Sequence, residues 1–337
     1  MSLPDPAPIR DLIEAFRRSK AMFTAVSMGI FDLLESAPAR AAEVAAALGV
    51  NGDATERLLD ACAALGLLAK HDGVYANQPV ASAYLVTSSP DSLYGYIRYS
   101  DEALYPLWRH LEDAVKEGTH RWRQTFQLDG PIFDHFFRTE KAMRDFLRGM
   151  HGNGLLTSHK VAAAFDLSRY RRMVDLGGAT GHLVIAACER YPGLDGVVFD
   201  LPHAAAQARE YVAASAAARR IEIVAGDFFR DELPPADLYA AGQILHDWPE
   251  EKIDALLGKA FARLPDGGAF LVAEKLLNED GVGPVGANMQ SLNMLVITEG
   301  KERSLSGYTR LLQNAGFTRV EGVRTGAYLD AILARKG

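Results

Sequence analysis

A histidine in the segment GQILHDWPEE, residues 242–251, is the first residue whose type and setting could do chemistry. His246 stands between an apolar run and an Asp-Trp-Pro turn. The ordinary pKa of histidine is about 6.5, so a neutral imidazole held against a substrate can act as a general base near neutral pH. A buried core histidine at the end of a strand is the alternative. This segment alone does not decide between the two.

A glycine-rich turn occurs in VDLGGATGHL, residues 174–183, where an apolar strand runs into a helix. Gly177, Gly178 and Gly181 allow a ligand to approach the backbone, and the helix N-terminus offers free N–H groups. Their spacing is not the G-x-G-x-x-G of dinucleotide-binding folds, which disfavours a nicotinamide-dependent reductase. Asp175, two positions before the first glycine, would repel a pyrophosphate but attract an ammonium or sulfonium group.

Two further acidic residues end the next two predicted strands. Asp200 comes 23 residues after Gly177, where a carboxylate can accept both ribose hydroxyls. In AGDFF, residues 225–229, Asp227 can accept from an adenine amino group and Phe228 can stack on the adenine ring. Each residue alone could instead cap a helix, form a turn or fill the core. Together the three acids predict a nucleoside with a cationic amino-acid tail, S-adenosylmethionine.

The elements that must position these residues alternate between strand and helix from residue 172 onward. Such alternation predicts an α/β fold with a parallel, doubly wound sheet. The last two apolar runs, TRVEGVRT and AYLDAILARK, are joined by a tight turn and predict an antiparallel hairpin at the sheet edge. In such sheets ligands bind beyond the carboxyl ends of the strands, where the acids and glycines are predicted to lie.

The N-terminal part has a different pattern. Residues 10–35, 40–50 and 55–70 have apolar residues at helical spacing, and residues 71–85 supply a turn and a short strand, which together indicate a winged-helix module. Residues 41–70 carry four acidic and two basic side chains, the opposite of what phosphate binding needs. We therefore expect a packing or dimerisation module and not a DNA-binding one.

Composition sets the outer limits. A chain of 337 residues with 48% hydrophobic and 23% charged residues is typical of an ordinary globular protein of more than one domain. The net charge of −7 and the lack of an 18-residue apolar run disfavour nucleic acid and membranes as partners. Cys62 and Cys188 form no Cys/His cluster, so we expect buried free thiols and a cytoplasmic protein.

With these residues identified, the chain from about residue 10 to 337 resembles the caffeate/acetylserotonin family of S-adenosylmethionine-dependent O-methyltransferases. The shared landmarks are FDLLE, DLGGATG, FDLP, GDFF, LHDW, SLNMLVITEGKERS and TGAYLDAILARK. The resemblance implies a class I methyltransferase fold, a Rossmann-like doubly wound sheet with an antiparallel C-terminal hairpin. It also implies an N-terminal all-α winged-helix domain that forms a homodimer. We expect this dimerisation domain at residues 1–110, a helical connector lining the substrate pocket at 111–170, and the methyltransferase domain at 171–337.

The resemblance also implies roles for individual residues. His246 would be the general base that removes a proton from the hydroxyl of a small aromatic acceptor, flanked by Glu274 and Glu302, with no metal. The residues expected at the cofactor are Phe137, Asp175, Gly177, Gly181, Asp200, Leu201, Gly226, Asp227, Phe228 and Gln243. Those expected to line the acceptor pocket are Phe146, Met150, Asp247, Asn293 and Met294.

Three positions depart from the family pattern. Ala179 replaces the third consecutive glycine, and Gln243 replaces a basic residue three positions before the histidine. Ile297 stands where the acetylserotonin enzymes favour a glutamine, which puts N-acetylserotonin itself in doubt as the acceptor. The remaining alternative is a chain that binds the cofactor but serves as a non-catalytic scaffold or regulatory subunit. The retained His246 and its two glutamates argue against that alternative.

Overall fold

The computed structural model describes residues 3–337. The chain divides into two compact units, the first ending at Ala103 and the second beginning at Leu104. None of the helices in the described range is both long and apolar enough to cross a membrane. Cys62 and Cys188 are buried free thiols.

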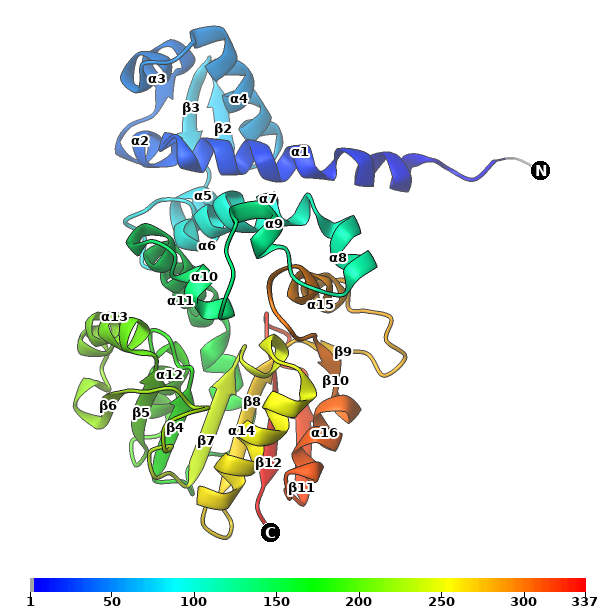
Figure 1. Cartoon of the computed structure of the whole chain (residues 1–337). Coiled ribbons are helices and arrows are strands. Elements are labelled where there is room, and N and C mark those ends of the chain that lie inside the picture. The colour runs from blue at the N-terminus through cyan, green and yellow to red at the C-terminus, as the bar shows by residue number, and fades with distance from the viewer. Residues whose placement is uncertain (1–2) are drawn as a thin grey trace. The chain divides into compact units, whose positions relative to one another are not determined.

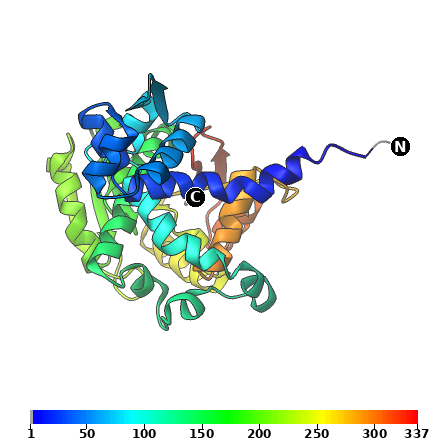
Figure 2. The ribbon, with the colours of Figure 1, turned by 90° about the horizontal axis from the view of Figure 1, so that it is seen from above.

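The first unit combines helices with a small sheet. Its elements are α1 (Ala7–Ser27), α2 (Ile30–Ser36), β1 (Ala39–Arg40), α3 (Ala41–Leu48), α4 (Gly52–Ala64), β2 (Leu68–His71), β3 (Val74–Asn77), α5 (Pro79–Tyr84), α6 (Tyr94–Tyr99) and the π-helical turn η1 (Ser100–Leu104). The helical pattern of residues 10–35 is divided between α1 and α2 at Gly29, whose φ of +74° lies in the left-handed region that glycine adopts without strain. Figure 2 shows the N-terminal end of α1 extending past the other helices of this unit.

The three strands of the first unit form the wing of the predicted winged helix. They pair antiparallel in the order β1-β3-β2, and Asp72 and Gly73, both at positive φ, make the tight turn between β2 and β3. The expected helical module therefore also contains a sheet. Its core gathers apolar side chains from α2, α4 and β3, among them Phe31, Leu59 and Tyr75.

The second unit begins with a helical segment and continues into the α/β part. The helical segment contains α7 (Tyr105–Trp108), α8 (Leu111–Glu117), α9 (Trp122–Phe126), α10 (Ile132–Phe136) and α11 (Glu140–Ala163). Helix α11 is the longest element of the chain among those described, and Thr139 caps its first turn by accepting a hydrogen bond from the Ala142 N–H.

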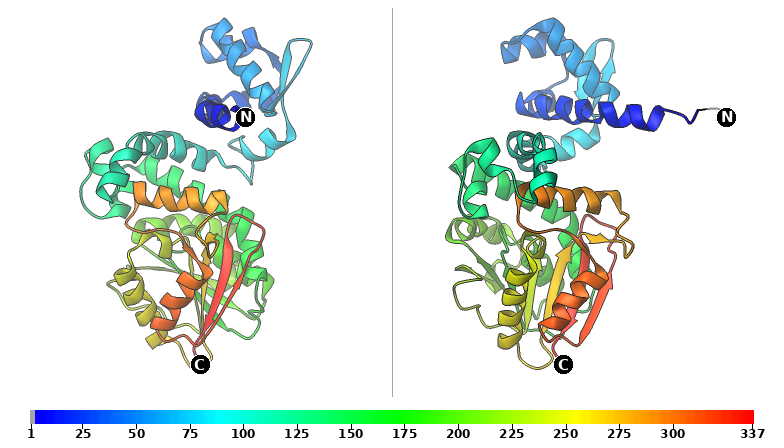
Figure 3. Two further views of the ribbon diagram at one scale, coloured as in Figure 1. Left: turned by 90° about the vertical axis from the view of Figure 1, so that its right-hand side faces the viewer. Right: turned by 45° about the vertical axis from the view of Figure 1, so that its right-hand side comes forward.

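A seven-stranded sheet follows, with its strands in the order β11-β12-β8-β7-β4-β5-β6. They are β4 (Arg172–Leu176), β5 (Asp195–Asp200), β6 (Ile221–Ala225), β7 (Leu238–Gly242), β8 (Ala269–Glu274), β11 (Arg319–Val323) and β12 (Asp330–Arg335). Five strands are parallel, and β12 runs antiparallel to both β8 and β11. Figure 3 shows this C-terminal pair at the edge of the sheet. The predicted doubly wound sheet with an antiparallel hairpin is confirmed.

Helices cover both faces of the sheet because successive strand residues point to opposite sides. On β4, Met173 packs with α11, α12 (His182–Arg190) and α13 (Pro202–Ala214), whereas Val174 packs with α14 (Glu250–Arg263) and α16 (Leu305–Asn314). Figure 1 shows α14 and α16 in front of the strands. The remaining elements are η2 (Ala218–Arg220), η3 (Leu245–Asp247), β9 (Leu276–Leu277), α15 (Val285–Ile297) and β10 (Arg303–Ser304).

The strand order reverses at β4, which has β5 on one side and β7 on the other. Connections leave such a point in opposite directions and open a crevice beyond the carboxyl ends of the strands. The glycine turn follows β4, Asp200 ends β5, Asp227 follows β6 and Gln243 follows β7. The fold thus brings residues far apart in the sequence to one edge of the sheet.

Candidate active site

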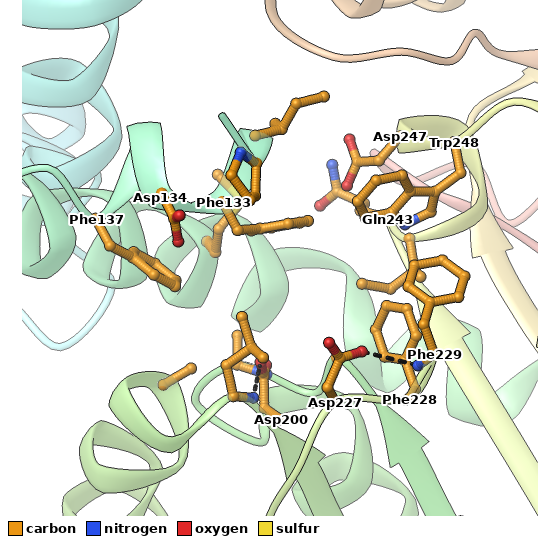
Figure 4. A pocket seen from close by; sticks show the side chains of 18 of the residues that line it. Phe133, Asp134, Phe137, Asp200, Asp227, Phe228, Phe229, Gln243, Asp247 and Trp248 are labelled. Atoms are coloured by element: carbon orange, nitrogen blue, oxygen red, sulfur yellow. Dashed lines mark hydrogen bonds between the residues drawn. The ribbon is translucent and has the colours of Figure 1, made fainter. Parts of the chain in front are cut away.

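A cavity of about 850 Å³ lies at the carboxyl ends of β4, β5, β6 and β7, and α10 and α11 contribute its opposite wall. Its aromatic lining comes from both sides: Phe133, Phe137, Phe146, Phe228, Phe229 and Trp248. Figure 4 shows Phe133 and Phe137 across the cavity from Trp248, with Asp200 and Asp227 at the strand ends. Flat apolar walls with a few carboxylates suit an aromatic ligand that also carries polar groups.

Most of the predicted ligand residues line this cavity. Those that do are Phe137, Phe146, Met150, Gly177, Asp200, Leu201, Gly226, Asp227, Phe228, Gln243 and Asp247. The predicted residues outside its lining are Asp175, Gly181, His246, Glu274, Asn293, Met294 and Glu302.

The carboxylates of Asp200 and Asp227 are held by backbone N–H groups. Asp200 accepts from the Ala179 N–H at 2.7 Å and from the Leu201 N–H at 2.7 Å, one on each carboxylate oxygen. Asp227 accepts from the Phe229 N–H at 2.8 Å. Burial raises the pKa of Asp200 to about 6, and the two N–H groups oppose that rise. Each oxygen keeps a second lone pair, so both carboxylates can still accept from a ligand.

Asp175 is not among the lining residues, and its carboxylate lies against Gly178 of the glycine turn, where a Cβ atom would be 3.0 Å from Oδ2. It is 2% exposed, and one carboxylate oxygen, Oδ2, has no hydrogen-bond partner within residues 3–337. Burial, with repulsion from Asp200, raises the pKa of Asp175 to about 8. Gly181 also serves packing, since a Cβ atom there would lie 2.9 Å from Val198 Cγ2.

The turn that faces the cavity has left-handed backbone at Gly177 (φ +68°), Ala179 (φ +48°) and Gly181 (φ +82°). A Cβ atom at Gly177 would lie 2.3 Å from Ile244 Cδ1, so a larger residue would have to displace that side chain and would also be strained at this φ. Ala179 is the one non-glycine residue of the three, and its Cβ makes this conformation unfavourable by roughly 1–2 kcal/mol. Gln243 is also left-handed, with φ +55°.

His246 lies against two buried glutamates. Its Nδ1 is 2.6 Å from Glu302 Oε1 and 3.1 Å from Glu274 Oε2. All three residues are at most 3% exposed. The other carboxylate oxygen of Glu274 accepts from the backbone N–H groups of Ile244 at 3.0 Å and Leu245 at 2.9 Å. Glu274 therefore orients both the imidazole and the backbone turn η3 that carries it.

Short local contacts bring Glu302 to this histidine from 56 positions away in the sequence. Strands β9 and β10, which follow the two glutamates, pair in parallel with Leu276 opposite Arg303. The buried Arg303 guanidinium donates to the Leu245 and Trp248 carbonyls at 3.4 Å. A Cβ atom at Gly300 would lie 2.2 Å from the His246 carbonyl oxygen, so glycine permits the close approach. Residues of the GKERS segment thus hold the LHDW turn in position.

The charges around the imidazole favour its protonated form. Burial lowers the pKa of His246, but the carboxylates of Glu274, Glu302 and Asp247 outweigh burial and raise it to about 10. Burial raises the pKa of Glu274 to about 8 and that of Asp247 to about 7. Since Nδ1 faces the glutamates, Nε2 is the nitrogen left for a substrate proton; it lies 3.6 Å from Oδ1 of Asp247, which lines the cavity.

The same three side chains also satisfy a simple distance test for a metal site, because one ligand atom from each lies within 4.8 Å of the others. The 2.6 Å separation of His246 Nδ1 and Glu302 Oε1 is a charge-assisted hydrogen bond. Two ligands of one tetrahedral Zn²⁺, each at about 2.1 Å, would stand roughly 3.4 Å apart. The geometry is therefore that of a hydrogen-bonded histidine.

Two residues expected at the acceptor lie on α15. Asn293 is 8% exposed, and its Oδ1 accepts from the Trp108 indole N–H at 2.7 Å, while Met294 is 2% exposed. Ile297, three residues on, is 4% exposed. Trp108 belongs to no recognised motif, so nothing in the sequence connects it with Asn293.

Several lining residues were missed by the sequence analysis. They are Phe133, Asp134, His182, Phe229, Trp248, Lys252 and Glu299. A signal existed for Phe229 and Trp248, because they belong to the GDFF and LHDW landmarks. Phe133 and Asp134 come from α10, whose sequence has no motif, and Lys252 and Glu299 form an ion pair at 2.5 Å that only the fold brings together.

Comparison with known proteins identifies the chain at the level of family. Residues 108–318 match the O-methyltransferase domain, which is more than half of the 337 residues, and residues 10–87 match the O-methyltransferase dimerisation domain. The chain belongs to the O-methyltransferase family. The dimerisation-domain match supports a homodimer, and α1 carries exposed apolar side chains inside that range, among them Leu12, Ile13 and Phe16.

Similar proteins cover nearly the whole chain. Acetylserotonin O-methyltransferase of Bos taurus is 40% identical over 97% of this chain and 97% of its own length. A "Probable bifunctional dTTP/UTP pyrophosphatase/methyltransferase protein" of Homo sapiens is 41% identical over 99% of this chain, but only 54% of its own length is matched. The crystal structure of human N-acetylserotonin methyltransferase with SAM has a TM-score of 0.94 at 38% identity and covers 100% of this chain and 99% of that one.

These findings confirm the predicted enzyme class and cofactor. The chain is an S-adenosylmethionine-dependent O-methyltransferase with a class I fold. The cavity fits that cofactor in chemical terms, because aromatic walls can stack an adenine and held carboxylates can accept from hydroxyl and amino groups.

The left-handed alanine of this O-methyltransferase leads to a stability prediction. Ala179→Gly removes the Cβ that is unfavourable at φ +48°, so the free energy of unfolding should rise by about 1 kcal/mol. Ala255→Gly in α14 is the matched control, since glycine in an exposed helix costs about 1 kcal/mol. The stability changes of both variants are measured as shifts of the thermal unfolding midpoint at one protein concentration. A lower thermal midpoint for both variants would contradict the assignment of strain to Ala179.

Proposed function

We propose that this O-methyltransferase methylates a hydroxyl of a small aromatic acceptor, a phenol or a hydroxyindole, with His246 as general base and without a metal. The observation that carries the proposal is the orientation of the imidazole, with Nδ1 on Glu302 and Glu274 and with Nε2 beside Asp247 of the cavity lining. A phenol has a pKa of about 10, so a base that removes its proton is useful near neutral pH.

In this proposal Asp200, Asp227 and Phe228 hold the adenosine part of the cofactor. Bound S-adenosylmethionine supplies a methyl group on a sulfonium sulfur, and the departing thioether is an excellent leaving group. The aromatic side chains of α10 and α11 cover the strand ends and exclude water, which would otherwise compete with the acceptor. The chain must then align the acceptor oxygen and take up one proton.

His246 performs the proton transfer. Its Nε2 accepts the proton of the acceptor hydroxyl, and its Nδ1–H stays on Glu302, which fixes the tautomer. The imidazolium that forms lies between Glu302 and Glu274, so its charge is compensated inside a buried site. The 2.6 Å Nδ1–Oε1 hydrogen bond leaves no room for a metal between these two atoms.

An aromatic acceptor follows from the walls of the site, and its identity is left open by two residues. The relatives above are named for acetylserotonin, a hydroxyindole-type acceptor. Here Gln243 lines the cavity and Ile297 is a buried apolar residue, and these are two of the positions at which the family resemblance implies a different side chain. We therefore assign the class of acceptor, a hydroxylated aromatic ring, and not the compound.

The direct test of the base is His246→Asn. The asparagine can still donate a hydrogen bond toward Glu302 but cannot accept a proton, so turnover should fall by about 10²- to 10⁴-fold. Affinity for S-adenosylhomocysteine, measured by calorimetry, should stay within a few-fold of the wild type and shows that the site is folded. Both proteins are assayed after dialysis against EDTA, where full wild-type turnover is expected. Unchanged turnover in the variant, or a wild-type loss restored by one divalent ion, would sink the proposal.

The two glutamates predict a pH dependence. Protonated His246 cannot act as a base, and its pKa is raised, so kcat/KM should increase with pH toward the alkaline side. Glu302→Gln removes a charge that raises this pKa. The rising limb should therefore move to lower pH, and the maximal rate should fall by about tenfold or more because the imidazolium loses its partner.

The control for this profile is Glu321→Gln, an exposed carboxylate paired with Arg335 on the C-terminal hairpin. Both variants are compared with one acceptor, so that the ionisation of the acceptor itself cancels. A limb that stays in place in Glu302→Gln, or moves to higher pH, would contradict the assigned role of Glu302.

A further inference from the structure

A histidine other than His246 lines the cavity and has no part in the mechanism above. His182 is the first residue of α12, directly after the glycine turn, and it lines the cavity together with Gly177, Ala179 and Asp200. The sequence analysis assigned it no role, although it stands inside the segment VDLGGATGHL.

Helix α11 fixes the orientation of this imidazole. The Ser158 hydroxyl lies 2.8 Å from His182 Nδ1. The ring packs directly on Gly154, where a Cβ atom would lie 2.3 Å from the ring Cγ, so no other residue at 154 leaves room for the ring. Helix α11 also makes a hydrogen bond to the glycine turn itself, between His151 Nδ1 and Thr180 Oγ1 at 2.8 Å. The imidazole is therefore preorganised before any ligand binds.

The remaining ring nitrogen, Nε2, has no hydrogen-bond partner within residues 3–337. It is also absent from the fully buried atoms that lack a partner, so this nitrogen retains some accessible surface. It is thus reachable by a ligand in the cavity. Burial, with the neighbouring His151, lowers the pKa of His182 to about 3, so the ring is neutral at neutral pH. The Ser158 hydroxyl can donate to Nδ1, and in that tautomer Nε2 carries the proton and can donate it to a ligand.

The charges of the cavity indicate which ligand group needs this donor. Five lining residues are acidic, namely Asp134, Asp200, Asp227, Asp247 and Glu299, and these suit ammonium and sulfonium groups. The two lining cations each pair with a lining carboxylate, Arg230 with Asp227 at 3.5 Å and Lys252 with Glu299 at 2.5 Å. Gln243 adds no charge. A neutral donor can therefore contribute to binding a carboxylate here.

We propose that His182 Nε2 donates a hydrogen bond to the α-carboxylate of the methionine part of S-adenosylmethionine, and that Ser158 and Gly154 position it for this contact. The inference rests on the placement of the cofactor in this cavity under the proposed function. It assigns the amino-acid end of the cofactor to the glycine turn and the first residue of α12. A neutral donor suits a site where an added cation would oppose the nearby sulfonium.

The test measures binding, without turnover, of two probes to the full-length protein. S-adenosylhomocysteine has the carboxylate, and its decarboxylated analogue keeps the ammonium group but lacks the carboxylate. His182→Ala should weaken S-adenosylhomocysteine by about 10- to 100-fold, as expected for a lost hydrogen bond to a charged group, and should leave the analogue within about twofold. His182→Asn, which keeps a donor, should recover part of the loss.

Two control variants separate the possible causes. His151→Ala removes the neighbouring brace of the turn and should change the two probes equally. Asp227→Asn should weaken both probes equally, because both contain adenosine. If Asp227→Asn changes neither probe, the placement of the cofactor fails and the inference with it. If Asp227→Asn weakens both but His182→Ala does not discriminate between them, the inference alone is overturned.

Discussion

The contact between the His246 imidazole and the buried carboxylates of Glu274 and Glu302 is the interaction on which the rest of the site depends. A carboxylate removed from water costs several kcal/mol unless it is paired and hydrogen-bonded. The imidazole pairs with one oxygen of Glu302, and the N–H groups of Ile244 and Leu245 bind one oxygen of Glu274, while the second oxygen of each glutamate has no hydrogen-bond partner within residues 3–337. Removing the imidazole altogether would leave two buried carboxylates facing each other. The base is therefore also a structural element of the η3 turn.

This constraint explains the surrounding architecture. Glu274 ends β8 and Glu302 precedes β10, and the short parallel pair β9–β10 sets their separation. Arg303 donates hydrogen bonds to two backbone carbonyls of the LHDW turn. Gly300 has no Cβ atom, so the segment before β10 can approach the backbone of this turn closely. At the other end of the cavity α11 performs a comparable task for the glycine turn, through His151 and Ser158. The proposed base and the proposed cofactor contacts are thus each held by buried or partly buried hydrogen bonds that do not involve the ligand.

Much of this arrangement could be predicted from the sequence because it depends on local patterns. Alternating apolar strands and helices predict the sheet, and parallel strands must bring Gly177, Asp200, Asp227 and Gln243 to one edge. The position of Asp175 could not be predicted, because a residue next to a turn can face either side of it and only packing decides.

Long-range contacts were beyond local patterns. Nothing in the residues alone connects Glu302 with His246, and only the resemblance to a family named that pair. The resemblance predicted that residues 111–170 line the pocket, but it did not single out the α10 residues, because apolar and aromatic residues in a helical segment are equally suited to a core or to a cavity. His182 could have been noticed in the sequence, because it is a polar residue that begins a helix after a glycine turn. Its contact with Ser158 on α11 could not be predicted from local patterns.

The central claim is that buried carboxylates hold the His246 proton on Nδ1 and leave Nε2 to act as the base. Nitrogen NMR of the protein labelled at histidine, bound to S-adenosylhomocysteine and titrated with pH, reports both ring nitrogens directly. The account predicts that Nδ1 of His246 stays protonated throughout, while Nε2 loses its proton only at a pH well above the ordinary pKa of histidine. A neutral His246 with its proton on Nε2, or a pKa at or below the ordinary value, would contradict it.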